Sequence, residues 1–227
     1  MKIDILTLFP EMFEGVFGES MVKLARKKGI VSIEVHNLRK WTHDRHRTVD
    51  DKPFGGGPGM VMKVEPVNEA LDEIRGSVPE GVVPLTVLLT PQGKLFSQGT
   101  AKVLSVVEYL VLICGHYEGF DERIRSLVDL ELSIGDYILT CGEIPAMAIC
   151  DAVVRLIPGV LGAEECLIDE SFENGLLEYP QYTRPSVYKG MKVPDVLLSG
   201  DPKRIEKWRE TQALRKTHAR RPDLLRK

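Results

Sequence analysis

The six residues Tyr109–Cys114 are almost continuously apolar, and this run constrains the fold more than any other feature of the sequence. A strand that is apolar along its whole length is typical of the centre of a parallel sheet, where helices cover both faces. Parallel strands are joined by crossover connections, which are usually helical. We therefore expect an α/β fold with a mostly parallel sheet and helices on both of its faces.

Hydrophobic patterns elsewhere supply the other elements of such a fold. The expected strands are 2–9, 30–38, 85–90, 109–114 and 130–133, and Pro91–Lys94 is expected to form a turn after the third of them. The expected helices are 20–28, 65–74, 97–105, 121–127, 143–157 and 201–220. Ser97 is a plausible N-cap for its helix, because a serine side chain can accept a hydrogen bond from the first turn.

Glycines interrupt the chain directly after two of these strands. The runs are Cys114-Gly-His-Tyr-Glu-Gly119 and Ser133-Ile-Gly-Asp-Tyr137, and the second continues to Gly142 and Glu143. In α/β proteins, ligands usually bind at loops that follow the carboxyl ends of strands. The alternative is two tight turns with solvated charges. From the residues alone, the chain is predicted to be a ligand-binding α/β protein.

The segment from Trp41 to Met60 has no hydrophobic periodicity. A segment of about twenty such residues inside a compact domain is more often functional than idle. Its glycine run, Gly55-Gly-Gly-Pro-Gly59, could bring backbone amides close to a phosphate or a base. The run has neither the spacing of a dinucleotide-binding fingerprint nor the lysine of a P-loop. The alternative is a flexible surface loop.

Positive charge is concentrated in two parts of a chain whose net charge is −3. The region 201–227 contains ten Lys and Arg against four Asp and Glu, a local charge of +6, and the region 39–52 adds further basic residues. Basic patches on a mildly acidic chain indicate a polyanionic partner such as nucleic acid. The alternative is an ordinary solvated basic helix.

Cysteine spacing and the amino terminus indicate where the protein works. The four cysteines at 114, 141, 150 and 166 show no paired spacing, so we expect neither a zinc site nor a disulfide framework. No apolar run approaches the ~20 residues of a membrane span, and Met1 leads straight into a strand pattern without a signal peptide. We expect a reduced, cytoplasmic protein with no membrane partner and no metal site.

Three parts of the chain are expected. Residues 1–160 would form the α/β domain, 161–175 a flexible linker rich in glycine and carboxylates, and 176–227 a small basic helical domain. The linker is assigned because its residues lack hydrophobic periodicity.

Several longer motifs together resemble the TrmD family of bacterial tRNA (guanine-N1)-methyltransferases. They are Thr42-His-Asp-Arg-His-Arg-Thr-Val-Asp-Asp51, Gly55-Gly-Gly-Pro-Gly-Met60, Cys114-Gly-His-Tyr-Glu-Gly119, Ser133-Ile-Gly-Asp-Tyr137, Ile157-Pro-Gly-Val-Leu-Gly162, Tyr182-Thr-Arg-Pro185 and Val196-Leu-Leu-Ser-Gly200. The similarity runs from Met1 to about Leu225, and many relatives continue with more helix, so we expect a shortened carboxyl-terminal domain.

This resemblance implies a SPOUT-type fold whose carboxyl-terminal part forms a trefoil knot. It implies a homodimer with the active site at the subunit interface, in which 1–160 binds the cofactor and dimerises and 176–227 binds tRNA. The implied reaction transfers the methyl group of S-adenosylmethionine to N1 of the guanine at tRNA position 37, next to the anticodon. A divalent ion could assist, but no site for one is placed.

The resemblance also implies catalytic residues. Arg155 matches the cation that stabilises negative charge at the guanine O6, and the base that removes the N1 proton belongs in the linker. The family usually reads Asp-Ser-Phe there, whereas this chain reads Asp169-Glu170-Ser171-Phe172. Ungapped counting from Ile157 puts Glu170 in the base position, with Asp169 as the competitor. A glutamate carboxylate can take a proton in the same way but reaches further.

The cofactor residues are implied by matching positions, and the substrate residues are candidates for contacts with the tRNA. Cofactor-binding residues would be Pro91, Gly115, Tyr117, Glu118, Ile134, Gly135, Tyr137, Leu139 and Gly142. Substrate-binding residues would be Asp50, Gly57, Gly59, Arg45, Arg184 and Arg215, with Arg47, Arg209 and Arg220 as further candidates for phosphate contacts. Two positions depart from the family pattern, Leu88 where some relatives have tyrosine and Cys141 in place of a glycine.

Two other functions stay open at this point. The first is a tRNA-binding relative without catalysis, in which the glutamate at the base position reflects lost activity. The second is an α/β enzyme that acts on a small nucleotide held by Gly55–Gly59. The second predicts no dependence on tRNA and little sensitivity of binding to salt.

Overall fold

The computed structural model describes residues 1–162 and 169–225 of the 227-residue chain. The chain divides into two compact units, Met1–Gly162 and Ala163–Lys227. Among the described residues, no helix combines the length and the apolar character that crossing a membrane would require.

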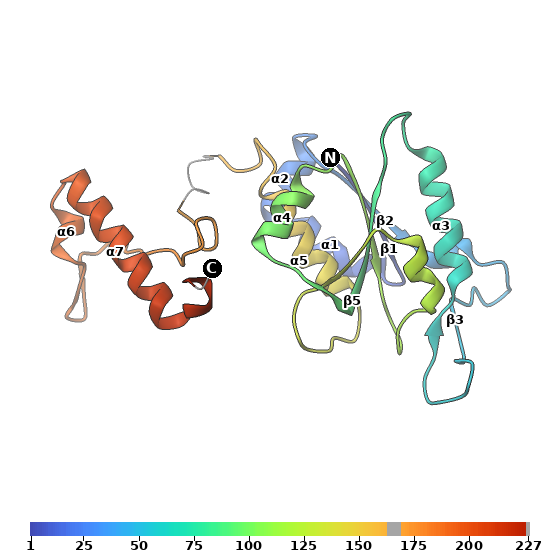
Figure 1. Ribbon diagram of the computed structural model, residues 1–227. Helices are drawn as coiled ribbons and strands as arrows, with labels where there is room; N and C mark the ends of the chain where they lie inside the picture. The colour runs from blue at the N-terminus through green and yellow to red at the C-terminus, as the bar shows by residue number, and fades with distance from the viewer. Residues whose placement is uncertain (163–168, 226–227) are drawn as a thin grey trace. The chain divides into compact units, whose positions relative to one another are not determined.

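The first unit is built on a five-stranded sheet. Its strands are β1 (Lys2–Thr7), β2 (Ser32–Asn37), β5 (Leu85–Leu95), β6 (Tyr109–Cys114) and β7 (Leu130–Ser133), in the order β2-β1-β6-β5-β7 (Figure 1). All neighbouring strands are parallel. Every residue of β6 is buried, as its continuous apolar character predicts. The expected α/β class with a mostly parallel sheet is confirmed.

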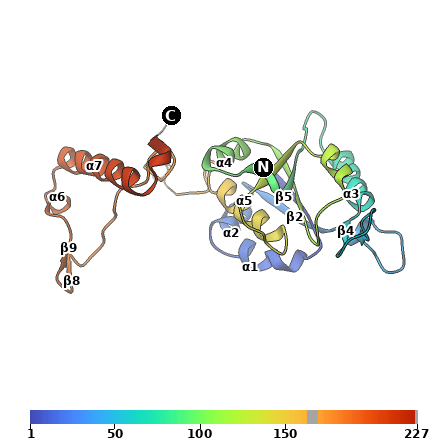
Figure 2. The same cartoon turned by 60° about the horizontal axis from the view of Figure 1, so that its bottom comes forward.

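Helices cover both faces of this sheet, as Figures 1 and 2 show. One face carries α1 (Glu14–Phe17), α2 (Ser20–Lys27), α4 (Gln98–Ser105) and α5 (Glu143–Val154). A 3₁₀ helix, η1 (Pro10–Phe13), directly precedes α1 on this face. The other face carries α3 (Val64–Ser77) and the 3₁₀ helices η2 (Leu38–Trp41) and η3 (Glu122–Leu127). Successive residues of β1 serve the two cores in turn, Ile5 facing the α5 side and Leu6 the α3 side.

Local capping explains where several helices begin and end. Ser97 accepts a hydrogen bond from the Thr100 N–H at 3.3 Å, so the predicted N-cap of α4 is confirmed. The helix predicted at 121–127 is confirmed and is of the 3₁₀ type, with Asp121 as its N-cap accepting from the Arg123 N–H. α5 ends at Val154, three residues before its predicted end at Ile157. The N–H groups of Leu156 and Ile157 donate to carbonyl oxygens three residues earlier, which is 3₁₀ rather than α-helical bonding, and Pro158 follows.

β5 is longer than predicted, and its extension crosses β7. Residues 91–94, predicted as a turn, belong to the strand. Leu132 of β7 is the register partner of both Leu89 and Lys94, with a shift in register between them. A Cβ on Gly93 would lie 2.5 Å from the Leu132 nitrogen, so the chain passes directly against the β7 backbone at this residue. Only glycine allows that approach.

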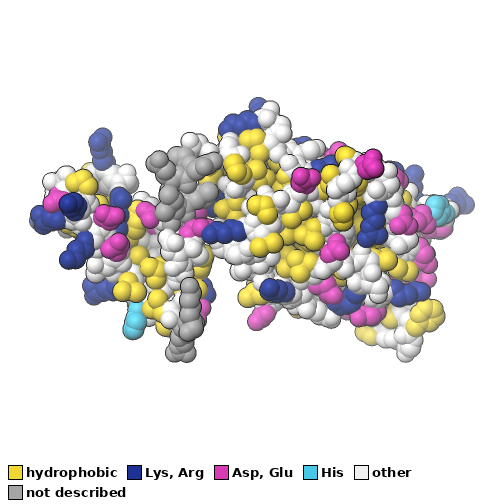
Figure 3. All heavy atoms as spheres, turned by 45° about the horizontal axis from the view of Figure 1, so that its top comes forward, with side chains coloured by type: hydrophobic (Ala, Val, Ile, Leu, Met, Phe, Trp, Pro, Cys, Tyr) yellow, Lys and Arg dark blue, Asp and Glu magenta, His cyan; other side chains and the backbone are white. Residues whose placement is uncertain are grey.

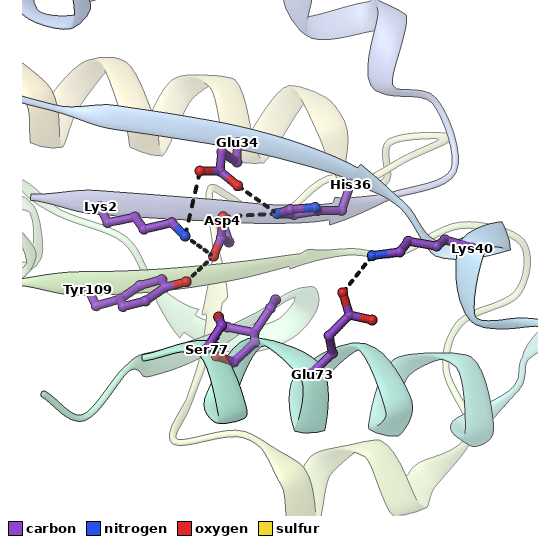
Figure 4. A network of polar contacts seen from close by, with 9 residues as sticks. Lys2, Asp4, Glu34, His36, Lys40, Glu73, Ser77 and Tyr109 are labelled. Carbon is purple, nitrogen blue, oxygen red and sulfur yellow. Dashed lines mark hydrogen bonds and ion pairs between the residues drawn. The ribbon is translucent and has the colours of Figure 1, made fainter. Parts of the chain in front are cut away.

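A buried polar network joins the three neighbouring strands β2, β1 and β6 (Figure 4). Asp4 on β1 is 1% exposed, lies 2.9 Å from His36 Nε2 and accepts a hydrogen bond from the Tyr109 hydroxyl. Lys2 Nζ lies 3.6 Å from both Asp4 and Glu34. Burial raises the pKa of Asp4, but the hydrogen bonds from His36 and Tyr109 and the charge of Lys2 lower it further, so the net pKa lies below its usual value.

Asp4, Glu34 and His36 also place potential metal-binding atoms within 4.8 Å of one another. The Lys2 ammonium already provides positive charge beside both carboxylates. The network therefore already holds a cation of the protein beside its carboxylates, and we read it as structural.

The second unit is organised on α7 (Pro202–Arg220), whose N-cap Asp201 accepts from the Arg204 N–H at 3.2 Å. It also contains α6 (Asp195–Leu198), the hairpin β8 (Val187–Tyr188) and β9 (Met191–Lys192), and a 3₁₀ helix, η5 (Pro222–Leu225). Of the predicted linker 161–175, residues 163–168 lie outside the described residues.

The part of the predicted linker that begins at Asp169 is bonded into the second unit. The Glu178 N–H donates to the Ser171 hydroxyl at 3.0 Å, and the Leu177 N–H donates to the Thr217 hydroxyl of α7 at 2.8 Å. Thr217 is fully buried. The segment 169–178 is therefore attached to the basic helix near its carboxyl end.

Candidate functional site

A cavity of about 310 Å³ lies at the carboxyl ends of β5, β6 and β7. Its walls are formed by residues 89–91 within β5 and by the loops that follow β6 and β7. All nine residues predicted to bind a cofactor lie on its lining: Pro91, Gly115, Tyr117, Glu118, Ile134, Gly135, Tyr137, Leu139 and Gly142. The structure thus brings together residues as distant in sequence as Pro91 and Gly142. Its position matches the rule that α/β proteins bind ligands at this edge of the sheet.

Glycines allow the loops to approach one another closely. The Gly142 N–H donates to the Gly115 carbonyl oxygen at 2.7 Å, and a Cβ on Gly142 would lie 2.5 Å from the Gly115 nitrogen. A Cβ on Gly115 would lie 2.6 Å from the ring of Phe120. A side chain at either position would force backbone or ring apart, so both glycines are required by the shape of the cavity.

Tyr117 links the cavity to the segment before the glycine run. It adopts a left-handed backbone conformation, with φ of 60°, and is 40% exposed. Burial raises the pKa of its hydroxyl, and the Asp50 carboxylate raises it further as charge and as hydrogen-bond partner. A predicted cofactor residue and a predicted substrate residue are therefore in contact.

The glycine run is carried by a short hairpin, β3 (Asp50–Asp51) and β4 (Val61–Met62). Its base is bonded to the loop after β6, because the Glu118 N–H donates to the Met60 oxygen at 3.0 Å and the Met62 N–H to the Gly119 oxygen at 2.9 Å. A Cβ on Gly59 would lie 2.6 Å from Glu118 Oε1. Gly59 therefore adjoins the cavity, while Gly57 is exposed in the loop.

Two buried polar groups beside the cavity were not predicted from the sequence. Glu143, the first residue of α5, is fully buried and accepts a hydrogen bond from the Thr7 hydroxyl at 2.5 Å. Within the described part of the chain, its Oε2 and the Nδ1 of His116 have no hydrogen-bond partner. Burial and the Glu143 charge raise the pKa of the Cys114 thiol well above its usual value. The sequence feature that could have identified Glu143 is a carboxylate at the first position of an otherwise apolar helix.

The two departures from the family pattern occupy different surroundings. Leu88 is fully buried in the core on the α3 side and does not line the cavity. Cys141 is partly buried and does line it. Only the second departure therefore changes the cavity wall.

The predicted catalytic residues are divided between the two units. Arg155 is the C-cap of α5 in the first unit, and its N–H donates to the Asp151 carbonyl oxygen at 3.2 Å. Asp169 and Glu170 both belong to the second unit, where they line a hollow of about 640 Å³ against α7. Asp169 and Glu170 therefore lie in one unit, and Arg155 lies in the other.

Tyr179 lies beside these carboxylates. The guanidinium carbon of Arg209 lies 4.8 Å from the centre of its ring, within the range of a cation–π contact. Burial raises the pKa of the Tyr179 hydroxyl, the Arg209 charge lowers it, and the charge and hydrogen bond of Asp169 raise it, with a net rise. Asp169 is thus tied through Tyr179 to a basic residue of α7.

The other predicted substrate residues are exposed arginines. Arg45 lies in the first unit, and Arg184 and Arg215 lie in the second. The further candidates Arg47, Arg209 and Arg220 are exposed as well. Exposed arginines of this kind suit phosphate contacts, which position a nucleic acid without reading its sequence.

Comparison with known proteins gives a consistent result over the whole chain. The sequence model of a family described as "tRNA (Guanine-1)-methyltransferase TrmD" matches residues 1–227. A relative from Dictyoglomus turgidum is 56% identical over 227 residues, which cover 100% of this chain and 91% of the relative. A relative from Bacillus subtilis is 54% identical over 226 residues, covering 99% and 92%. Both are named "tRNA (guanine-N(1)-)-methyltransferase".

Proposed function

The chain belongs to the TrmD family of tRNA (guanine-N1)-methyltransferases, and on this premise we propose that it methylates N1 of the guanine at position 37 of tRNA with S-adenosylmethionine as methyl donor. The single observation that carries the proposal is the cavity at the carboxyl ends of β5, β6 and β7, because one continuous wall contains every residue that family resemblance assigns to the cofactor. We place the reaction in the cytoplasm, where the tRNA substrate is found.

The residues of the cavity fit the proposed cofactor. Its volume of about 310 Å³ lies within the usual range for small-molecule sites. Pro91, Ile134 and Leu139 offer apolar walls for an adenine ring, and the glycine-rich loops leave backbone groups open to its polar edge. Glu118 offers a carboxylate for the ammonium group of the methionine part. When bound, the cofactor supplies an activated methyl group on a sulfonium.

The protein's own task is then to hold the guanine and to remove its N1 proton. We assign removal of the N1 proton to the Glu170 carboxylate. We assign stabilisation of the negative charge at O6 to the Arg155 guanidinium. A glutamate reaches about one methylene further than the aspartate usual in the family, which its position on the hollow beside α7 can accommodate. Asp169, tied to Tyr179, is assigned a supporting role.

Because Arg155 and Glu170 belong to different units, we propose that the active site forms at the interface of a homodimer. Exposed apolar side chains on the first unit support this: Figure 3 shows them gathered on one of its faces. Exposed large apolar side chains of the first unit include Leu95 at the end of β5, Val103 and Val106 at the end of α4, and Ile138 and Ile144 near the start of α5. Contiguous apolar surface of this kind marks a site for a protein partner.

We further propose that the carboxyl-terminal part of the first unit is threaded as the SPOUT trefoil knot. The crossing of β7 by β5 at Gly93 supports this, because the chain that leaves β7 must then return past that crossing to begin α5 beside Gly115. The second unit, with its basic helix α7, would bind the tRNA.

The test is a direct assay of product. The protein is incubated with S-adenosylmethionine and an unmodified tRNA transcript that carries guanine at positions 36 and 37, and the nucleosides are analysed by mass spectrometry. We expect 1-methylguanosine, and we expect its loss when position 37 is adenine. Tight binding of the tRNA without methylated product would instead favour a non-catalytic tRNA-binding relative. The same assay with EDTA determines whether a divalent ion takes part.

A further inference from the structure

Phe54 is the most exposed large apolar side chain among the described residues, with a relative exposure of 101%. Burying a phenylalanine side chain typically stabilises a protein by ~1.5–3 kcal/mol, so full exposure forgoes that stabilisation. No packing role within the described parts of the first unit accounts for the residue. An aromatic ring held entirely in water, on a loop whose base is bonded to the cavity wall, is available to contact a ligand.

The loop that carries Phe54 is well suited to present a ring to a substrate. Figure 1 shows the β3–β4 loop extending away from the sheet. Gly55, Gly56, Gly57 and Gly59 all have positive φ, a conformation that other residues rarely adopt. The foot of the loop is nevertheless bonded to the Glu118–Gly119 segment of the cavity wall. The loop that carries the ring is therefore anchored at its base to the wall of the proposed cofactor cavity.

Charge around the loop identifies the chemistry of the ligand. Lys52 lies two residues before Phe54 and is exposed, and so are Arg45 and Arg47 in the preceding turn, together with the carboxylates Asp44 and Asp51. Proteins that bind single-stranded nucleic acid combine positive side chains on the phosphates with aromatic rings on which bases stack. This combination favours a nucleobase over an apolar protein surface as the partner of Phe54.

We propose that Phe54 stacks on a tRNA base adjacent to the methylated guanine and fills the place that this guanine leaves in the stack. The inference rests on the proposed function, because a base must leave its stack before an enzyme can reach its ring atoms. Side chains that act as apolar wedges offset the cost of unstacking in other nucleic-acid-binding proteins. The loop would thus favour the extruded state of the guanine that enters the active site.

The test uses a tRNA transcript with the fluorescent base 2-aminopurine at position 38, whose emission rises when the base loses its stacking partner. With the natural protein, we expect binding to leave the emission low, since Phe54 replaces the guanine. With Phe54→Ala, we expect a higher emission on binding and about tenfold weaker tRNA binding, the loss typical of one stacked base. Phe54→Trp should restore both.

The matched control is Val83→Ala, which removes a side chain that is 84% exposed in the loop before β5. It should change neither signal, and S-adenosylmethionine binding without tRNA should be equal in all variants. Equal emission and equal tRNA affinity for Phe54→Ala and the natural protein would overturn the proposal. So would a change in oligomeric state, which would assign the ring to a second copy of the chain. Formation of 1-methylguanosine by the natural protein tests the proposed function separately.

Discussion

The backbone nitrogen of Gly142 donates a 2.7 Å hydrogen bond to the backbone oxygen of Gly115. This bond fixes the residue before α5 against the residue after β6, and both residues line the cavity. The approach is so close that the cavity depends on the absence of a side chain at position 142.

Gly142→Ala is therefore expected to weaken S-adenosylmethionine binding at least tenfold. Its Cβ would meet backbone atoms of Gly115 and Cys114 at 2.5 and 2.8 Å, and backbone cannot move aside as a flexible side chain can. Calorimetric titration with the cofactor measures the loss. Gly76→Ala in α3 is the control, since nothing lies within 4 Å of its Cβ, and it should bind as the natural protein does. Unchanged affinity for Gly142→Ala would show that the cofactor binds elsewhere.

The choice between Glu170 and Asp169 as the base can be decided by neutral isosteres. Glu170→Gln is expected to lower the rate of methyl transfer by ~10²–10⁴-fold, the range typical of a lost general base. Asp169→Asn should retain most of the rate, because that carboxylate interacts with Tyr179. Single-turnover rates at saturating tRNA compare the two. The reverse order of effects would make Asp169 the base.

Thr217 is expected to be a positioning residue. Its buried hydroxyl accepts from the Leu177 N–H at 2.8 Å and donates to the Ala213 oxygen at 2.7 Å. Thr217→Val leaves the Leu177 N–H without this partner, at a cost of ~1–3 kcal/mol in the free energy of unfolding. Since Glu170 belongs to the same anchored segment, the rate of methyl transfer should fall while cofactor affinity stays constant.

Thr211→Val is the matched control for this change. Thr211 is on the same helix and also donates to the carbonyl four residues back, at 2.7 Å, but it is exposed. Its replacement should change neither stability nor rate. Thermal unfolding and single-turnover kinetics of the full chain measure both variants, and equal rates for the two would remove the proposed link between α7 and the base.

Asp4 is expected to make stability depend on pH. Its folded pKa lies below the ordinary value of 3.8, so its contribution is complete above that value and is lost as the pH falls through the folded pKa. Asp4→Asn should lower the free energy of unfolding by ~3 kcal/mol at pH 7, as expected when one partner of a buried charge pair is removed. The difference from the natural protein should shrink below pH 3.8.

Urea denaturation between pH 7 and pH 3 provides this measurement. Glu34→Gln serves as the control, because the Glu34 side chain is 53% exposed and its loss should cost less than ~1 kcal/mol. A difference between Asp4→Asn and the natural protein that stays constant with pH would contradict the prediction.

The main strands could be predicted from the sequence because their periodicity is strong. Tyr109–Cys114 has one apolar face on each core, and its bounds were predicted without error. The two-residue strands β3, β4, β8 and β9 were missed, because two residues carry no period. Residues 91–94 are predicted to form a turn, because proline and glycine usually end a strand. Only the passage of the chain against β7 explains their place in β5.

The cavity lining followed from glycines placed directly after strands, together with family resemblance. Contacts between distant parts of the chain did not follow. Thr7 and Glu143 are 136 positions apart in sequence and form a buried hydrogen bond. Nothing in either residue's sequence neighbourhood predicts that the two side chains meet. Asp169 and Tyr179 are closer in sequence, but their contact depends on how the segment folds onto α7.

The passage of the chain across β7 at Gly93 has a consequence for the order of events during synthesis. The walls of the cavity come from residues between Leu89 and Pro145, and the strand that is crossed is made almost forty residues after the glycine that crosses it. A nascent chain that ends before β7 therefore lacks one whole wall of the cavity, however much of the rest of its sheet has formed. The ability to bind the methyl donor should appear in one step late in translation.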